Sequence, residues 1–132
     1  MNNVKIIKIP NILDRRGNLA HIENKGIIPF SVKNVFYLYD VPSGSKRGGH
    51  AHRKLQQLLI AVSGSFDVII NDGSTEKTIS LNRPNKGLLI PSMIWREMEN
   101  FSNGSVCLVL ASMKYDESDY FRDYKEYVEN LK

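Results

Sequence analysis

Short runs of apolar and β-branched residues, separated by turn residues, make up most of the chain. The runs are KIIKI, NVFYLYD, LLIAV, FDVII, TISL, GLLI and VCLVLA, and glycine, proline or asparagine lies between most of them. Runs of this length with frequent turn residues are typical of β-strands. Ser-Gly-Ser at 63–65 joins LLIAV to FDVII, and Asn-Asp-Gly at 71–73 indicates a tight turn before TISL. The pattern predicts an all-β sandwich or barrel of antiparallel strands.

Residues 116–131 follow a different pattern, because their apolar side chains recur at helical spacing. These side chains are Tyr120, Phe121, Tyr124, Tyr127, Val128 and Leu131. Acidic residues occupy the positions between them. We expect one amphipathic C-terminal helix, capped by Asp116 or Ser118, whose aromatic stripe docks on the core.

The length and composition fit one globular domain that spans residues 1–132. The chain is 42% hydrophobic and 24% charged, so it can bury a core. No apolar run approaches the roughly 20 residues that a membrane helix needs, and the N-terminal residues do not resemble a secretory signal. We therefore expect a cytoplasmic protein with no membrane partner. The single cysteine, Cys107, lies in the run VCLVLA and is expected to be an inert core residue.

Positive charge is concentrated in the first part of the chain. Residues 1–54 contain ten Lys and Arg against three Asp and Glu, within a net charge of +4. There is no contiguous basic run and no aromatic-basic module of the kind that binds RNA, so we expect no nucleic-acid partner. A phosphorylated small molecule is the favoured anion, and a solvated basic face is the alternative.

The densest polar cluster is RGGHAHRK at 47–54, which contains two of the three histidines. On a strand, His50 and His52 project to the same face. If that face is the barrel interior, the two imidazoles converge on one cavity. If it is the outer face of an edge strand, they are solvated.

The spacing of this cluster resembles the first motif of the cupins, which are small double-sheet β-barrels. Gly44, His50, His52, Gln57 and Gly64 follow that motif, with Gln57 where a metal-binding glutamate usually stands. The amide is a weak metal ligand.

A second segment, PSMIWR at 91–96 followed by Asn100, resembles the second cupin motif. Arg96 stands at the position of its metal-binding histidine, and a guanidinium does not bind a cation. We therefore expect no metal and predict that the histidines transfer protons.

The resemblance extends over nearly the whole chain to one family, the nucleotide-sugar 3,4-ketoisomerases. The matching segments are DRRGNLAHIE, PFSVKNVFYLYDVP, RGGHAHRKLQQLLIAVSGSFDVIINDG, GLLIPSMIWREMENFSNGSVCLVLAS and YDESDYFRDYKEY. These enzymes convert dTDP-4-keto-6-deoxyglucose into a 3-keto isomer. The resemblance implies a cupin-type jelly-roll barrel, a site without metal or other cofactor, and a homodimer that exchanges N-terminal strands. It also implies that a PLP-dependent aminotransferase uses the product.

The resemblance also assigns residues. The family's paired histidines fall on His50 and His52, its strand tyrosine on Tyr37, and its two arginines on Arg47 and Arg16. Phe36 and Arg96 depart from the family pattern, which commonly has tyrosine and histidine there.

The chemistry suits these residue types. Isomerisation removes a proton from C3 of a 4-keto sugar and returns one at C4, and imidazole titrates near neutrality. We expect His50 to be the base, with His52 orienting it or handling hydroxyl protons. Tyr37 or the second imidazolium would donate to the enediolate oxygen, and Arg47 and Arg16 would pair with the diphosphate.

Weaker candidates have structural alternatives. Trp95 is predicted to stack on the nucleotide or sugar, with burial in the core as the alternative. Gln57 is predicted to bind a histidine or the sugar, with simple burial as the alternative. Tyr39 and His21 are expected to serve packing or surface roles. The rival functions are a non-catalytic cupin that binds a nucleotide sugar or regulates a pathway, and a metal-dependent cupin oxygenase.

Overall fold

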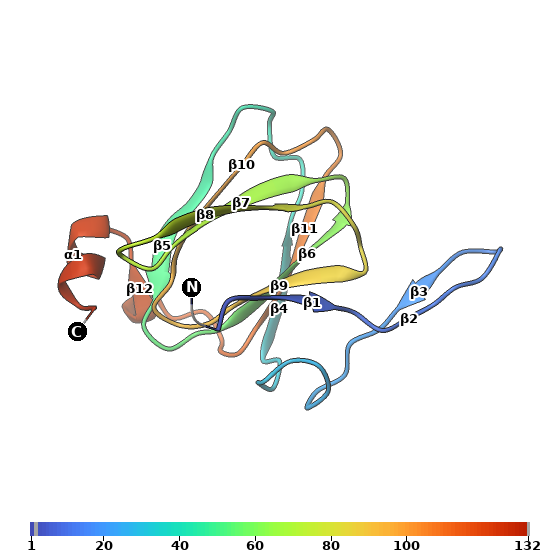
Figure 1. The fold of residues 1–132 in the computed structure, drawn as a ribbon, viewed down its shortest axis with the longest axis horizontal. Coiled ribbons are helices and arrows are strands. Elements are labelled where there is room, and N and C mark those ends of the chain that lie inside the picture. The colour runs from blue at the N-terminus through green and yellow to red at the C-terminus, as the bar shows by residue number, and fades with distance from the viewer. Residues whose placement is uncertain (2, 132) are drawn as a thin grey trace.

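The computed structural model describes residues 1 and 3–131, which fold into two facing β-sheets with a short helix at the C-terminal end (Figure 1). All strand pairs are antiparallel. The first sheet contains, in spatial order, β1 (Lys5–Lys8), β9 (Lys86–Ile90), β6 (Gln57–Ser63), β11 (Val106–Ala111) and β4 (Asn34–Leu38). The second contains β12 (Tyr120–Phe121), β5 (Arg47–His52), β10 (Trp95–Glu99), β7 (Phe66–Asn71) and β8 (Glu76–Leu81). The predicted jelly-roll barrel is confirmed.

A small hairpin stands apart from the barrel. It consists of β2 (Asn11–Ile12) and β3 (Leu19–Ala20), and it projects away from the two sheets (Figure 1). Its apolar side chains Ile12, Leu13 and Leu19 are exposed. The barrel therefore carries an N-terminal arm whose apolar side chains are not packed against the rest of the described chain. None of the helices in the described part of the chain has the length and apolar character needed to cross a membrane.

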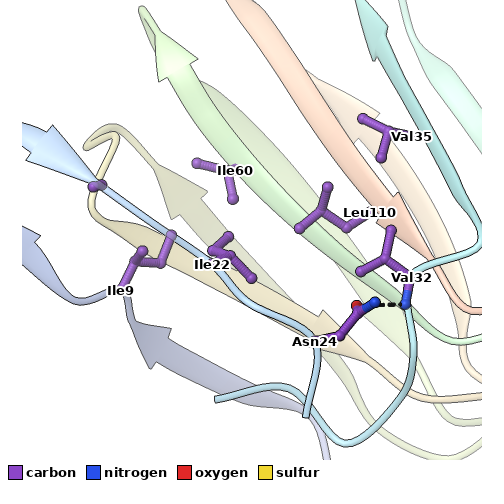
Figure 2. Close-up of a pocket in the computed structure, with 8 residues that line it drawn as sticks. Ile9, Ile22, Asn24, Val32, Val35, Ile60 and Leu110 are labelled. Atoms are coloured by element: carbon purple, nitrogen blue, oxygen red, sulfur yellow. Dashed lines mark hydrogen bonds between the residues drawn. The ribbon is translucent and has the colours of Figure 1, made fainter. Parts of the chain in front are cut away.

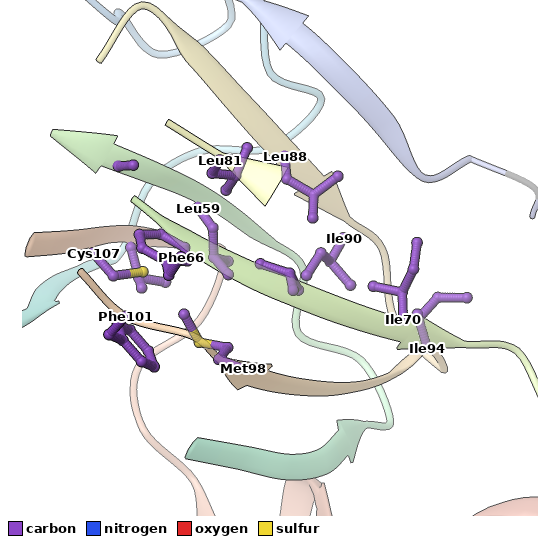
Figure 3. Close-up of a cluster of buried hydrophobic side chains, with 13 residues drawn as sticks. Leu59, Phe66, Ile70, Leu81, Leu88, Ile90, Ile94, Met98, Phe101 and Cys107 are labelled. Carbon is purple, nitrogen blue, oxygen red and sulfur yellow. The ribbon is translucent and has the colours of Figure 1, made fainter. Parts of the chain in front are cut away.

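The main core fills the space between the two sheets (Figure 3). Side chains of β7 alternate between the core and the outer side, so Phe66, Val68 and Ile70 point inward. Cys107 lies in this core, and burial raises the pKa of its thiol to about 12. The expectation that Cys107 is an inert core residue is thus confirmed.

The C-terminal segment is not the single helix that its spacing predicts. Glu117–Asp119 form a 3-10 turn, Tyr120–Phe121 form β12, and only Tyr124–Glu129 form the helix α1. The predicted helix is present but shorter than expected, because the carboxylate of Asp119 accepts the backbone N–H groups of Lys54 and Leu55 and holds the chain beside β5. Tyr120 and Phe121 then pair with His52 and Ala51.

Side chains in this segment still cap and dock as their types predict. Asp116 caps the 3-10 turn and Asp123 caps α1. Tyr127 is fully buried, and its hydroxyl donates to the carbonyl oxygens of Asn71 and Met93. The helix therefore covers the outer face of the second sheet.

The hairpin of β6 and β7 provides a stability test, because its turn requires glycine. Gly64 has φ +67°, and a Cβ there would lie 2.8 Å from Cα of Ser105. Gly104 has φ +74° with open space around it. An alanine at Gly104 therefore suffers the backbone strain of a positive φ without a steric clash, and it serves as the control for Gly64. We expect Gly104→Ala to cost about 1 kcal/mol and Gly64→Ala at least about 1 kcal/mol more, measured by urea unfolding. Equal losses in the two variants would contradict the packing argument.

Candidate active site

A cavity of about 380 Å³ opens inside the barrel, between the two sheets. Strands of both sheets contribute side chains to its wall. Its polar lining includes Arg47, His50, Gln57, Arg96, Tyr120 and Arg122. The interior of the barrel thus contains a compact polar site in a largely apolar core.

A β-bulge in β5 places the histidines in this interior. Arg96 of β10 pairs with His50 and Glu97 pairs with Gly48, which leaves Gly49 as the extra residue. Gly48 and Gly49 both have positive φ, and a Cβ on Gly48 would lie 3.1 Å from the carbonyl oxygen of Arg96. The two glycines of the RGGHAH run are therefore needed for the bend that precedes His50.

The two imidazoles lie together, as strand alternation predicts. Their ring centroids are 4.9 Å apart and their planes are nearly perpendicular. His50 is half-buried and borders the cavity, whereas His52 is fully buried behind it. Nδ1 of His52 lies 3.1 Å from Oδ2 of Asp119. Direct contact with a molecule in the cavity therefore falls to His50.

The guanidinium of Arg96 is fully buried and faces the same cavity. It donates to Oε1 of Gln57 at 2.6 Å and to the carbonyl oxygen of Ile94 at 3.0 and 3.2 Å. No carboxylate among the described residues forms an ion pair with it. Burial lowers the pKa of Arg96 to about 10, so the group stays cationic at pH 7. The cavity wall therefore carries a positive charge that no acidic side chain neutralises.

This charge acts on the histidines. Burial, followed by the charge of Arg96, lowers the pKa of both His50 and His52 to about 3. Both imidazoles are therefore neutral at pH 7 in the ligand-free site, each with one nitrogen free to accept a proton. Titration near neutrality, which the sequence suggested, is wrong because the sequence does not reveal the buried cation beside the pair.

Two further arginines lie at the cavity mouth, one paired with a carboxylate and one without such a partner among the described residues. Arg122 forms two hydrogen bonds with the carboxylate of Glu117, at 2.6 and 2.9 Å, and its Cζ lies 4.1 Å from the centroid of the Tyr120 ring. Arg47 is exposed, and no ion pair of Arg47 occurs among the described residues. Arg47 is thus placed to take an anion at the entrance.

The structure does not bring Tyr37 to the histidines. Phe36 and Leu38 line the cavity, so alternation along β4 turns Tyr37 to the outer side of the sheet, where it is 59% exposed. Tyr39 lies beside it, with ring centroids 5.9 Å apart. Within this chain, the predicted donation from Tyr37 to an enediolate oxygen has no geometric support.

Two other predicted residues also lie outside the cavity. Trp95 is buried on the outer face of the second sheet, where it packs against Tyr124 and Tyr127 of α1. Its burial there supports the alternative of a core role. Arg16 lies in the loop between β2 and β3 and is 90% exposed, with an ion pair to Asp14 at 2.8 Å. Of the secondary candidates, only Gln57 lies in the cavity, where it binds Arg96 and neither histidine.

Sequence reasoning missed three residues near the histidines, all from the segment predicted to be helical. The Tyr120 ring lies 4.3 Å from the His52 ring and 5.0 Å from the His50 ring, centroid to centroid. Asp119 contacts His52, and Arg122 borders the cavity. The helical spacing gave no signal for them, because only the pairing of β12 with β5 brings them to the site.

No group of three or more His, Cys, Asp or Glu side chains within residues 1 and 3–131 is arranged to hold a metal ion. Gln57 and Arg96 instead bind each other on the wall that faces the histidines. The proton-transfer chemistry available here is that of a neutral imidazole beside a buried cation. Such a pair suits reactions in which a carbon acid loses a proton and an oxygen gains negative charge.

Known proteins with similar sequences and structures share this fold over almost their whole length. The TDP-4-oxo-6-deoxy-alpha-D-glucose-3,4-oxoisomerase of Aneurinibacillus thermoaerophilus is 43% identical over 130 residues, which cover 96% of this chain and 94% of that protein. A mutant of the 3,4-ketoisomerase QdtA from Thermoanaerobacterium thermosaccharolyticum, in complex with TDP-4-keto-6-deoxyglucose, is 44% identical with a TM-score of 0.97, over 99% of this chain and 95% of that one.

A second solved structure is the WlaRB TDP-quinovose 3,4-ketoisomerase of Campylobacter jejuni. It is 47% identical with a TM-score of 0.95, over 98% of this chain and all of that one (100%). The family described as FdtA: WxcM-like, C-terminal matches residues 2–132. Because the match spans nearly every residue, the chain belongs to the FdtA family.

Proposed function

We propose that the chain is a 3,4-ketoisomerase that converts dTDP-4-keto-6-deoxyglucose into a dTDP-3-keto-6-deoxyhexose without a metal. The observation that carries this proposal is the neutral imidazole of His50 beside the unpaired cation of Arg96 in one cavity. The relatives that act on TDP-linked keto sugars support the substrate class. A doubly charged nucleotide sugar does not cross a bilayer unaided, which fits a cytoplasmic enzyme.

His50 is proposed as the base. Its neutral imidazole takes the hydrogen from C3 as a proton, the electron pair forms the C3–C4 double bond, and O4 gains negative charge. The imidazolium returns the proton at C4, the C3 hydroxyl loses its proton as C3 becomes the new carbonyl, and that proton passes to O4, which becomes the new hydroxyl. C3 of the sugar is oxidised and C4 is reduced in these steps, so no external redox partner is needed. A positioned base of this kind typically increases the reaction rate by about 10²- to 10⁴-fold.

Arg96 is proposed to stabilise the enediolate. A cationic donor that is already in place in a buried site lowers the free energy of the transition state by roughly 3–4 kcal/mol when it faces developing negative charge. Arg96 meets this description because it is charged, buried and held by Gln57 and the Ile94 carbonyl before substrate arrives. It replaces Tyr37, which faces the other way. Arg47 at the mouth is proposed to pair with the diphosphate.

A homodimer is part of the proposal. An apolar groove of about 370 Å³ lies on the outer side of the first sheet (Figure 2). Figure 2 shows Ile60, Leu110 and Val35 on this surface, with Ile9 and Ile22 along its rim. The projecting hairpin offers a matching set of exposed apolar side chains: Ile12, Leu13 and Leu19. Two such surfaces on one chain fit a second copy, and exchange of the arms would take Arg16 away from its own barrel.

The first prediction of this proposal concerns His50. We expect His50→Asn to lower kcat by at least about 100-fold, because Asn cannot accept the C3 proton, while dTDP affinity and the fold survive. The measurement is deuterium exchange at C3 of the substrate in D₂O, followed by NMR. His21→Asn is the matched control, since His21 is exposed and lies outside the cavity. Wild-type exchange in the His50 variant would remove His50 from the base role.

The second prediction concerns Arg16 and the dimer. We expect Arg16→Ala to raise KM, because Arg16 is proposed to bind diphosphate in the partner's cavity. Mixed dimers of Arg16→Ala and His50→Asn chains would contain one intact site, built from His50 of one chain and Arg16 of the other. Activity with the wild-type KM should therefore appear only after subunit exchange. Its absence from a mixture shown to contain mixed dimers would refute the shared site.

A further inference from the structure

A buried carboxylate lies directly behind the histidine pair. Asp119 is 5% exposed. Its Oδ1 accepts the backbone N–H of Lys54 at 2.9 Å, and its Oδ2 accepts that of Leu55 at 3.2 Å. Oδ2 also lies 3.1 Å from Nδ1 of His52. Two backbone donors therefore hold the carboxylate in a fixed orientation toward one nitrogen of His52.

Asp119 does not border the cavity, so it cannot contact a substrate there. Its only side-chain hydrogen-bond partner among the described residues is His52. His52 in turn packs edge-to-face on His50 and against the ring of Tyr120. Any effect of Asp119 on the reaction must therefore pass through the imidazole of His52.

A carboxylate accepts hydrogen bonds and does not donate them. Its contact with Nδ1 therefore requires the proton of a neutral imidazole to sit on Nδ1. Nε2, on the other side of the ring, then carries the lone pair. Nε2 of His52 is buried and has no hydrogen-bond partner among the described residues, so it is an unused acceptor beside the proposed base.

We infer that Asp119 is a positioning residue that fixes His52 as the Nδ1–H tautomer and keeps Nε2 as a proton acceptor next to His50. The tautomer depends only on the geometry of the ligand-free protein, whereas its consequence for turnover rests on the proposed isomerase function. With Nε2 unprotonated, His52 can accept, by way of His50 at the cavity wall, the hydroxyl proton that the C3 alcohol releases as it becomes a carbonyl. With the other tautomer, Nε2–H would block that step.

The other charged groups near His52 determine whether its ring is neutral or cationic. Arg96 of β10 and Arg122 after β12 are cationic, and together with burial they keep the ring neutral at pH 7. His50 of β5 and Tyr120 of β12 are the remaining titratable side chains packed against it. A neutral ring has one N–H, and Asp119 is the group in contact that decides which nitrogen carries it.

The test is the tautomer itself, read from ¹⁵N NMR of the imidazole nitrogens in the ligand-free protein. The chain has three histidines, so the His52 signals can be assigned with His21→Asn and His50→Asn variants. In the wild type we expect Nδ1 of His52 to carry the proton. In Asp119→Asn, the amide oxygen can keep a backbone N–H while the amide nitrogen donates to Nδ1. We therefore expect the proton to move to Nε2 and kcat to fall roughly 10- to 100-fold.

Asp123→Asn is the matched control, because asparagine caps α1 as well as aspartate does and Asp123 is exposed. This control should leave both the tautomer and kcat unchanged. A wild-type spectrum with the proton on Nε2 would overturn the inference by itself, even if the Asn variant failed to fold. A moved proton with unchanged kcat would also overturn it. Failure of the wild type to isomerise the sugar would instead contradict the proposed function and leave the tautomer result to stand.

Discussion

The guanidinium of Arg96 lies between the two sheets without a carboxylate partner among the described residues, and much of the site depends on that charge. Burying an unpaired cation is costly, and here only Gln57 and the Ile94 carbonyl offset the cost. The same charge keeps the nearby imidazoles neutral and makes the cavity receptive to an anion. The neutral state of His50 in the ligand-free site and the stabilisation of an enediolate thus have one physical source.

The fold supplies three devices that hold this arrangement. The bulge at Gly49 sets the direction of β5 before His50. The pairing of β10 with both β5 and β7 fixes Arg96 opposite the histidines. The short strand β12 closes the second sheet at β5 and brings Tyr120 and Asp119 to His52. The bulge and the strand pairings are all features of the backbone, so the positions of the site residues depend on strand register.

The sequence predicted the strands, the β6–β7 hairpin and the shared face of the histidines, because alternation and turn residues are local signals. It could not orient β4, whose Phe36 and Tyr37 are both aromatic, so period-two alternation left open which one faces inward. It gave Trp95 a stacking role with core burial as the alternative, and it assigned no role to Arg96. Since α1 covers the outer face, the tryptophan is buried there, and the arginine is the one that faces the cavity. The C-terminal helix is shorter than its spacing predicts, because long-range pairing of β12 with β5 outweighed local helical spacing there.

The most direct test of the central claim is an NMR titration of the His50 imidazole in the ligand-free protein between pH 8 and pH 4.5. Burial and the charge of Arg96 lower its pKa to about 3, so the ring should remain neutral across this whole range. Protonation with a midpoint near 6.5, the ordinary value for histidine, would contradict the claim. It would mean that the buried guanidinium does not control the histidine pair.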